Sequence, residues 1–209
     1  MAEIIDFLPD ATFVLDNDRR VIAWNKAIEE LTGIAKEQIL GKGDYEYALP
    51  FYNRRRPLVA DLILGDDSGI ESDYDFLKRS GDTITGEVFV PSVKRGAGAY
   101  LMVVASPLRD RHGIIVGVIE SIRDITERKL AEDANLWLRN LLRNTIDSMT
   151  SIIIGVDATG TVNQWNIEAE RFTGIGREEA MGKSIPEVFP IINQCRESLN
   201  SALLSGRVA

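Results

Sequence analysis

The chain divides at Asp124-Ile125-Thr126-Glu127-Arg128-Lys129, a stretch that has similar sequence on both sides of it. Asp124, or Thr126 in a shifted frame, can accept a hydrogen bond from the free amides of a first helical turn. Glu127 follows Asp124 by three residues, as a capping box requires. The stretch therefore predicts a strand that ends where a helix begins.

The predicted helix covers residues 127–149, because no Pro or Gly interrupts that segment. Its apolar residues Leu130, Ala134, Trp137 and Leu141 recur at steps of three and four residues, and Leu142 adjoins the last of them. This spacing places them on one face of an otherwise polar helix. Such a face suits pairing with a second copy of the same helix. We therefore expect a homodimer that forms through this helix and the domain before it.

An internal repeat relates the two sides of the helix. A shift of 141 residues aligns residues 5–42 with 146–183 without a gap, and 13 of the 38 aligned positions are identical. The identical pairs include tryptophans, asparagines and glycines: Trp24 and Trp165, Asn25 and Asn166, Gly33 and Gly174, Gly41 and Gly182. A repeat of this kind indicates one supersecondary unit used twice.

Each copy is predicted to form a β-hairpin followed by two short helices. In the first copy, residues 12–15 and 21–24 are β-rich runs that a polar turn joins. Asn25 follows the second run, and Asn166 holds the same place in the second copy, where an Asn side chain caps the free amides of a helix. Trp24 and Trp165, directly before them, are predicted to anchor the core. Gly33 and Gly41 stand where a left-handed residue ends a helix.

Three more strands are predicted in the first half of the chain, at residues 83–93, 99–108 and 114–122. A further helix is predicted at residues 57–64. Together with the hairpin, these strands predict an α+β domain with a five-stranded antiparallel sheet. Short helices would cover one face of that sheet.

These features together resemble the PAS family of sensory domains. The likeness rests on the Asp-turn-Val-x-x-Trp-Asn segment, the Thr-Gly-Ile cap, the Leu-Gly-Lys that follows, and the three later strands. It also rests on the closing run from Ser121 to Arg128. The resemblance implies that Asp124, Ile125 and Thr126 form the junction at which the domain passes its state into the helix.

The resemblance also implies a domain organisation. Residues 1–126 are expected to form one PAS domain and residues 127–149 a signalling linker helix. Residues 150–209 are expected to form the N-terminal half of a second PAS domain, because the sequence stops before any counterpart of the last three strands.

Composition argues against several classes of function. The formal net charge is -8, which argues against nucleic acid as a partner. No apolar run approaches the roughly 20 residues that span a bilayer, and the N-terminus lacks the features of a signal peptide. We therefore expect a cytoplasmic protein without direct membrane insertion. The sequence shows no nucleophile-base pair, Walker motif or kinase ATP motif, so no catalytic activity is predicted for this chain.

His112 and Cys195 are the two residues to consider for a cofactor. His112 could ligate haem iron, but it falls in the predicted turn at residues 110–113, facing solvent. Cys195 resembles the cysteine of flavin-binding photosensor PAS domains. It comes about ten residues after the position used in that family, which here holds Ser184. We therefore predict neither haem nor flavin, and no metal site.

Aromatic and basic side chains surround the segment that, by the resemblance, lies over a ligand cavity. They are Tyr45, Tyr47, Phe51, Tyr52, Arg54, Arg55 and Arg56. The candidate pocket residues are Tyr52, Arg56, Phe89, Leu101 and Val103. Aromatic rings could line a pocket, and a guanidinium could pair with a ligand carboxylate. Ordinary core packing and a solvated loop are the favoured interpretation of the same residues.

Two functions are compatible with these predictions. The first is the sensor module of a signal-transduction protein, which in this family is most often a histidine kinase. An unknown small ligand or a partner would shift the sheet, and the junction would pass the shift to the helix. The second is a constitutive dimerisation scaffold that binds no ligand. A well-packed interior without room for a small molecule would favour the scaffold.

Overall fold

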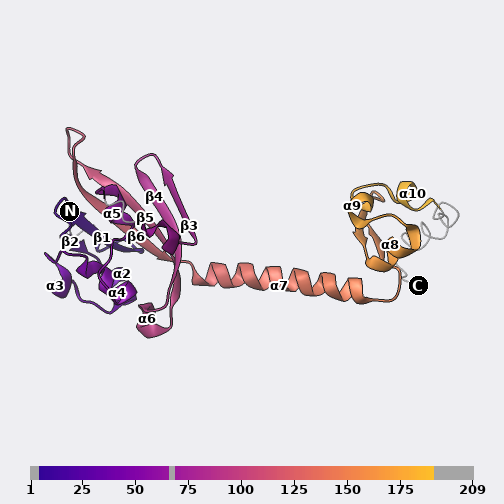
Figure 1. Ribbon diagram of the computed structural model, residues 1–209, viewed down its shortest axis with the longest axis horizontal. Coiled ribbons are helices and arrows are strands. Elements are labelled where there is room, and N and C mark those ends of the chain that lie inside the picture. The colour runs from indigo at the N-terminus through magenta and orange to yellow at the C-terminus, as the bar shows by residue number, and fades with distance from the viewer. Residues whose placement is uncertain (1–4, 66–68, 191–209) are drawn as a thin grey trace. The chain divides into compact units, whose positions relative to one another are not determined.

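The computed structural model describes residues 5–65 and 69–190 (Figure 1). The chain divides into two compact units, Met1–Glu132 and Asp133–Ala209. The boundary between them falls within a continuous helix, α7 (Thr126–Ser148). Each unit has a hydrophobic core of its own.

The first unit is built on a six-stranded antiparallel sheet (Figure 1). Its strands are β1 (Ala11–Asp16), β2 (Val21–Trp24), β3 (Phe76–Ser80), β4 (Thr83–Val90), β5 (Ala99–Arg109) and β6 (Ile115–Asp124). Their order across the sheet is β2-β1-β6-β5-β4-β3. The first and last strands of this unit, β1 and β6, are therefore neighbours inside the sheet, with Phe13 opposite Glu120.

The predicted fold class is confirmed, with one strand more than the five expected. The additional strand, β3, lies at the edge of the sheet and pairs only with β4, with Phe76 opposite Glu87. Every residue of β3 except Leu77 is exposed. A strand without a buried face needs no alternation of apolar and polar residues, which is the pattern that identifies a half-buried strand.

Short helices cover one face of the sheet. They are α2 (Lys26–Thr32), α3 (Lys36–Ile39), η1 (Glu46–Ala48), α4 (Leu49–Tyr52), α5 (Val59–Ile63) and η2 (Ile70–Asp73), and α6 (Val93–Gly96) lies between β4 and β5. Ile28 of α2, Phe51 of α4 and Val59 of α5 share one core with Phe13 and Leu101 of the sheet. Burial of each such side chain contributes roughly 1.5–3 kcal/mol.

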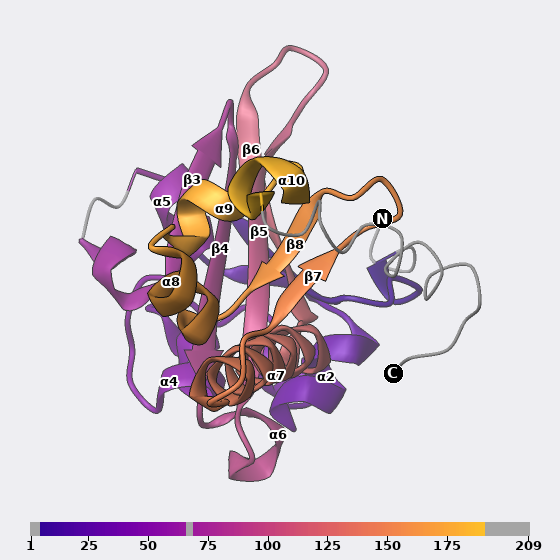
Figure 2. The ribbon, with the colours of Figure 1, turned by 90° about the vertical axis from the view of Figure 1, so that its right-hand side faces the viewer.

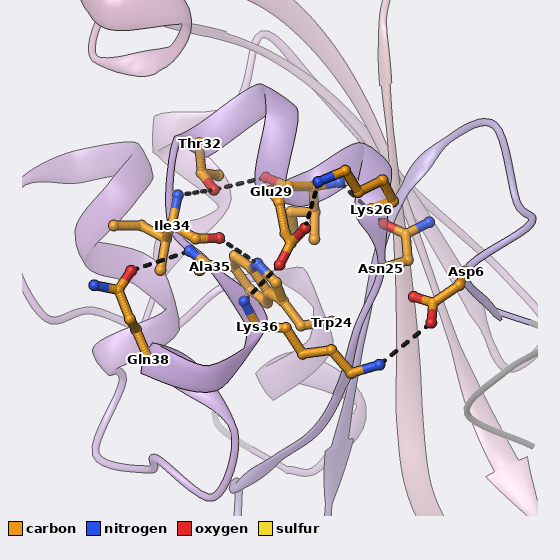
Figure 3. Close-up of polar contacts among 11 residues, drawn as sticks. Asp6, Trp24, Asn25, Lys26, Glu29, Thr32, Ile34, Ala35, Lys36 and Gln38 are labelled. Atoms are coloured by element: carbon orange, nitrogen blue, oxygen red, sulfur yellow. Dashed lines mark hydrogen bonds and ion pairs between the residues drawn. The ribbon is translucent and has the colours of Figure 1, made fainter.

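Asn25 and Trp24 hold the turn from β2 into α2 (Figure 3). Asn25 Oδ1 accepts hydrogen bonds from the amides of Thr12, at 2.9 Å, and Ile28, at 3.0 Å. It thereby caps α2 and ties it to β1. The buried Trp24 donates from Nε1 to the carbonyl oxygen of Ile34 at 3.1 Å. The predicted helix cap and core anchor are confirmed.

The second unit repeats this arrangement in its described residues (Figure 2). Its elements are β7 (Ile154–Val156), β8 (Val162–Trp165), α8 (Ile167–Thr173), α9 (Arg177–Ala180) and α10 (Ile185–Val188). Asn166 Oδ1 accepts the amides of Ile153 and Ala169, and Trp165 Nε1 donates to the carbonyl oxygen of Ile175. The repeat in the sequence is therefore a repeat of the same hydrogen bonds.

The long helix α7 matches the predicted one to within a residue at each end. None of its residues is buried. The apolar face remains exposed, with 58% of Leu130, 66% of Trp137 and 43% of Leu141 accessible. Over residues 5–65 and 69–190, no helix combines the length and apolar character needed to cross a membrane.

Candidate sensing cavity and signal junction

A small cavity lies between the sheet and the short helices of the first unit. Its lining residues are Phe51, Tyr52, Leu58, Tyr74, Val88, Val90, Leu101, Val103, Glu120 and Ile122. Its volume of about 10 Å³ accommodates about one water molecule. Of these lining residues, Tyr52 alone is half-buried, and the others are buried.

Glu120 is the only residue with a carboxyl or basic side chain in this lining. It lies on β6, is 1% exposed, and accepts a hydrogen bond at Oε2 from the amide of Ala60 in α5, at 2.6 Å. Among the described residues, none donates a hydrogen bond to Oε1. Burial raises the pKa of Glu120 to about 8, the Ala60 amide opposes this rise, and the nearby Asp61 carboxyl group adds to it. The carboxyl group is therefore mostly protonated at neutral pH.

Asp61 is a second buried carboxyl group next to Ala60. It accepts hydrogen bonds from Tyr47 Oη at 2.7 Å and from the Leu58 amide at 2.8 Å. Arg19 Nε lies 3.3 Å from Asp61 Oδ1. Burial and the Asp61 charge raise the pKa of Tyr47, so its hydroxyl stays a donor. These contacts connect α5 to η1 and to the turn between β1 and β2.

Three of the five predicted pocket residues come together at the cavity. Tyr52, Leu101 and Val103 line it. Arg56 is buried but does not line it. Its guanidinium lies 4.4 Å from the centre of the Tyr52 ring, and its Nη2 lies 2.7 Å from Asp73 Oδ2. A role for these residues in ligand binding stays a prediction.

The prediction that Phe89 lines the cavity is wrong. Phe89 is 47% exposed, and the centre of its ring lies 4.9 Å from that of Tyr100. Its neighbours Val88 and Val90 line the cavity instead. Successive side chains point to opposite faces of a strand, so an error of one residue exchanges the buried and exposed faces.

Sequence reasoning missed Glu120 and Tyr74. Tyr74 follows η2 and is buried, and this burial raises the pKa of its hydroxyl well above the usual value. Glu120 alternates along β6 with the buried residues Val118 and Ile122. A lone acidic residue at an apolar position of a strand is the signal that could have found Glu120.

Hydrogen bonds to β5 hold the junction at the end of β6. Asp124 Oδ1 accepts the amide of Thr126 at 2.8 Å, and Thr126 Oγ1 accepts the amide of Tyr100 at 3.0 Å. The Ile125 amide donates to the carbonyl oxygen of Tyr100 at 2.8 Å. Lys94 pairs with Asp124. Partial burial raises the pKa of Asp124, but hydrogen bonds from Lys94 and Thr126 outweigh it and hold the pKa below its usual value.

Glu87 of β4 attaches the first turn of α7 to the sheet. Its carboxylate oxygens lie 2.6 Å from Arg128 Nη2 and 2.6 Å from Lys129 Nζ. These hydrogen bonds, that of Lys129 first, lower the pKa of Glu87. Sequence reasoning missed this contact because Glu87 and Arg128 are 41 residues apart. The start of α7 is thus bound to β4 by charge and to β5 through Thr126.

Neither of the two cofactor candidates is a described residue of this cavity. His112 is exposed in the turn after β5, where Asp110 Oδ1 accepts the amides of His112 and Ile114. Cys195 lies outside the described residues. In the described part of the chain, no three or more His, Cys, Asp or Glu side chains are grouped so as to hold a metal ion.

Comparison with known families finds two matches that follow one another along the chain. A family model described as the PAS fold matches residues 5–130, and another model of the PAS fold matches residues 140–208. The first match alone covers more than half of the chain.

Several curated relatives are phytochromes. The phytochrome of Picea abies is 26% identical over 199 residues, which are 91% of this chain and 16% of that protein. Phytochrome B of Arabidopsis thaliana is 26% identical over 198 residues, which are 90% of this chain and 16% of that protein. The chain thus spans about 16% of the length of these relatives.

Solved structures of PAS domains are also similar to this chain. The PAS domain of Bordetella pertussis BvgS is 18% identical, with a TM-score of 0.42, covering 67% of this chain and 95% of that domain. The PAS domain of a protein from Colwellia psychrerythraea is 25% identical, with a TM-score of 0.41, covering 60% of this chain and 94% of that domain.

Proposed function

Because this chain belongs to the PAS-fold family of sensor domains in signalling proteins, we propose that it is the input module of a cytoplasmic histidine kinase. A stimulus at the cavity of the first unit displaces α5 relative to the sheet. The strand β6 carries this displacement through Asp124, Ile125 and Thr126 into α7. Such a relay needs two arrangements that differ by only a few kcal/mol.

The path of β6 is the observation that supports this relay. Glu120 in the middle of the strand accepts a hydrogen bond from Ala60 of α5. At the end of the same strand, Ile125 and Thr126 bind the backbone of Tyr100, and α7 begins. A movement of α5 therefore acts on the strand that leads directly into the helix.

We further propose that α7 pairs in parallel with α7 of a second copy. Leu130, Trp137 and Leu141 lie on one face of the helix and are largely exposed. Water contact with a continuous apolar stripe of this kind is unfavourable, and pairing of two such helices removes it. The pairing would let each module act on the output of a dimer.

Two leucines of α7 provide a matched test. Leu141 lies in the apolar stripe, and Leu136, five residues earlier, lies about 140° away around the helix. We expect Leu141→Glu to weaken self-association at least tenfold, as measured by sedimentation velocity, and Leu136→Glu to leave it nearly unchanged. Unchanged association of Leu141→Glu would remove this stripe from the interface. Equal loss in both variants would also contradict the assignment.

The small volume of the cavity favours a second candidate, a constitutive dimerisation scaffold without a ligand. A cavity of about 10 Å³ accepts nothing larger than a water molecule unless side chains move. Native mass spectrometry after gentle purification separates the two functions. A retained small molecule adds a defined mass to each chain, and this result would exclude the scaffold.

A further inference from the structure

The carboxyl group of Glu120 lies at the cavity, and its second oxygen, Oε1, accepts no hydrogen bond from the described residues. The side chain is 1% exposed, and only Oε2 is engaged, by the Ala60 amide, among the described residues. Tyr52 and Tyr74 share the lining, and the remaining lining residues are apolar. Once Glu120 loses its proton, a carboxylate oxygen without a donor is unfavourable. The site is therefore complete when its occupant donates a hydrogen bond to Oε1.

No cation in this lining balances Glu120. Arg56 is the nearest candidate, but its guanidinium is paired with Asp73 and lies against the ring of Tyr52, outside the lining. A ligand carboxylate would therefore meet the carboxyl group of Glu120 rather than a guanidinium. A positively charged ligand would meet a carboxylate and two tyrosine rings, all of which attract cations.

We propose that this cavity binds a small aliphatic ammonium ion, which donates a hydrogen bond to Glu120 Oε1 and contacts the rings of Tyr52 and Tyr74. The inference rests on the proposed function, because it names the class of ligand that the first unit senses. Tyr52 admits the ligand. It ends α4, is the half-buried member of the lining, and precedes the exposed Asn53. Outward rotation of its side chain enlarges the cavity beyond the volume of one water molecule.

Ammonium binding is coupled to the release of a proton from Glu120 to the buffer. The other titratable groups around Glu120 are Asp61 on α5, Tyr52, Tyr74 and the guanidinium of Arg56. Burial raises the pKa of both tyrosines, so they stay neutral. The pKa of Glu120 is about 8, and the ammonium ion binds the carboxylate. Affinity should therefore rise about tenfold per pH unit up to about pH 8 and then level off.

An NMR titration of the full chain tests the proposal, with the Ala60 amide as the reporter. The probes are methylammonium, methanol of similar size, and formate, at constant ionic strength. We expect methylammonium to bind in the millimolar range, as suits a ligand of so few atoms, and tenfold more tightly at about pH 7 than at about pH 6. Methanol should bind more weakly and without pH dependence. Formate should not bind.

Glu120→Gln is the matched variant, because it keeps an acceptor for the Ala60 amide and cannot become charged. It should weaken methylammonium binding at least tenfold and remove the pH dependence. In Tyr52→Ala, which has a larger cavity, isobutylammonium should also bind.

Three results would overturn the proposal: formate binding as tight as that of methylammonium, methylammonium binding that is indifferent to pH and to Glu120→Gln, or no ammonium binding even by Tyr52→Ala. None of these results depends on dimerisation through α7. The relay is tested independently by Leu141→Glu, so the two can fail separately.

Discussion

Asn25 uses both ends of its side-chain amide inside the first unit. Its Oδ1 accepts two backbone amides, and its Nδ2 donates to the carbonyl oxygens of Leu8 and Asp10, at 3.2 and 2.9 Å. The residue is fully buried. It thus joins the segment before β1, the strand β1 and the start of α2 through one side chain.

Asn25→Asp tests this arrangement. The aspartate keeps the acceptor but loses the donors and brings a negative charge toward carbonyl oxygens. We expect the free energy of unfolding to fall by about 3 kcal/mol, as measured by urea denaturation. Asn17→Asp is the control, because the Asn17 amide makes an exposed contact in the turn between β1 and β2. Equal effects of the two substitutions would contradict the role of Asn25.

Glu120 makes the stability of the first unit depend on pH. Its pKa is raised from 4.5 to about 8 by burial. Between these values the folded state keeps a proton that the unfolded state has released. Stability should therefore fall as pH rises through this window, by at most about 1.4 kcal/mol per pH unit. Urea denaturation between about pH 5 and about pH 8 should show this slope in the natural chain and not in Glu120→Gln. The same slope in both proteins would assign it to other groups.

At the scale of elements, one hydroxyl group contributes a hydrogen bond to the junction between β6 and α7. Thr126 Oγ1 accepts the amide of Tyr100, which places the first residue of α7 beside β5. Thr126→Val keeps the shape and removes the acceptor. We expect a loss of about 1–2 kcal/mol and faster hydrogen exchange at the Tyr100 amide.

Thr145 provides the control for this prediction. It lies in the same helix, and its hydroxyl donates to the carbonyl oxygen of Leu141 at an exposed position. Thr145→Val should leave exchange at Tyr100 unchanged. Protection of the Tyr100 amide that survives Thr126→Val would show that the hydroxyl does not hold the junction.

At the scale of the whole molecule, the first unit contains everything that its core requires. Its core cluster draws only on residues of Met1–Glu132, and this unit includes the contacts of Glu87 with Arg128 and Lys129. We therefore expect a chain of residues 1–132 to fold alone. Its amide NMR spectrum should overlay that of the full chain at the residues of the sheet. Widespread shifts or an unfolded spectrum would contradict independent folding.

Local sequence was enough to predict much of this chain. The caps at Asn25 and Asn166, the two tryptophan anchors and the helix α7 follow from contacts between residues close in the sequence. Strand alternation suggested Leu101 and Val103 as lining residues, whereas Tyr52 was expected there only from the family resemblance. Spacing and residue type suffice where a structure depends on near neighbours.

The remaining features of the fold and of the cavity depend on packing between segments that are far apart in the sequence. Glu120 meets Ala60 across 60 residues, and Glu87 meets Arg128 across 41. The exposure of Phe89 and the pairing of β3 depend on strand register. A shift of one residue in the register moves each side chain to the opposite face of the sheet. Charge and volume inside the cavity depend on how these segments close around it. The spacing of residues along the chain does not specify the distances between such segments. The acidic cavity is therefore visible only in the folded structure.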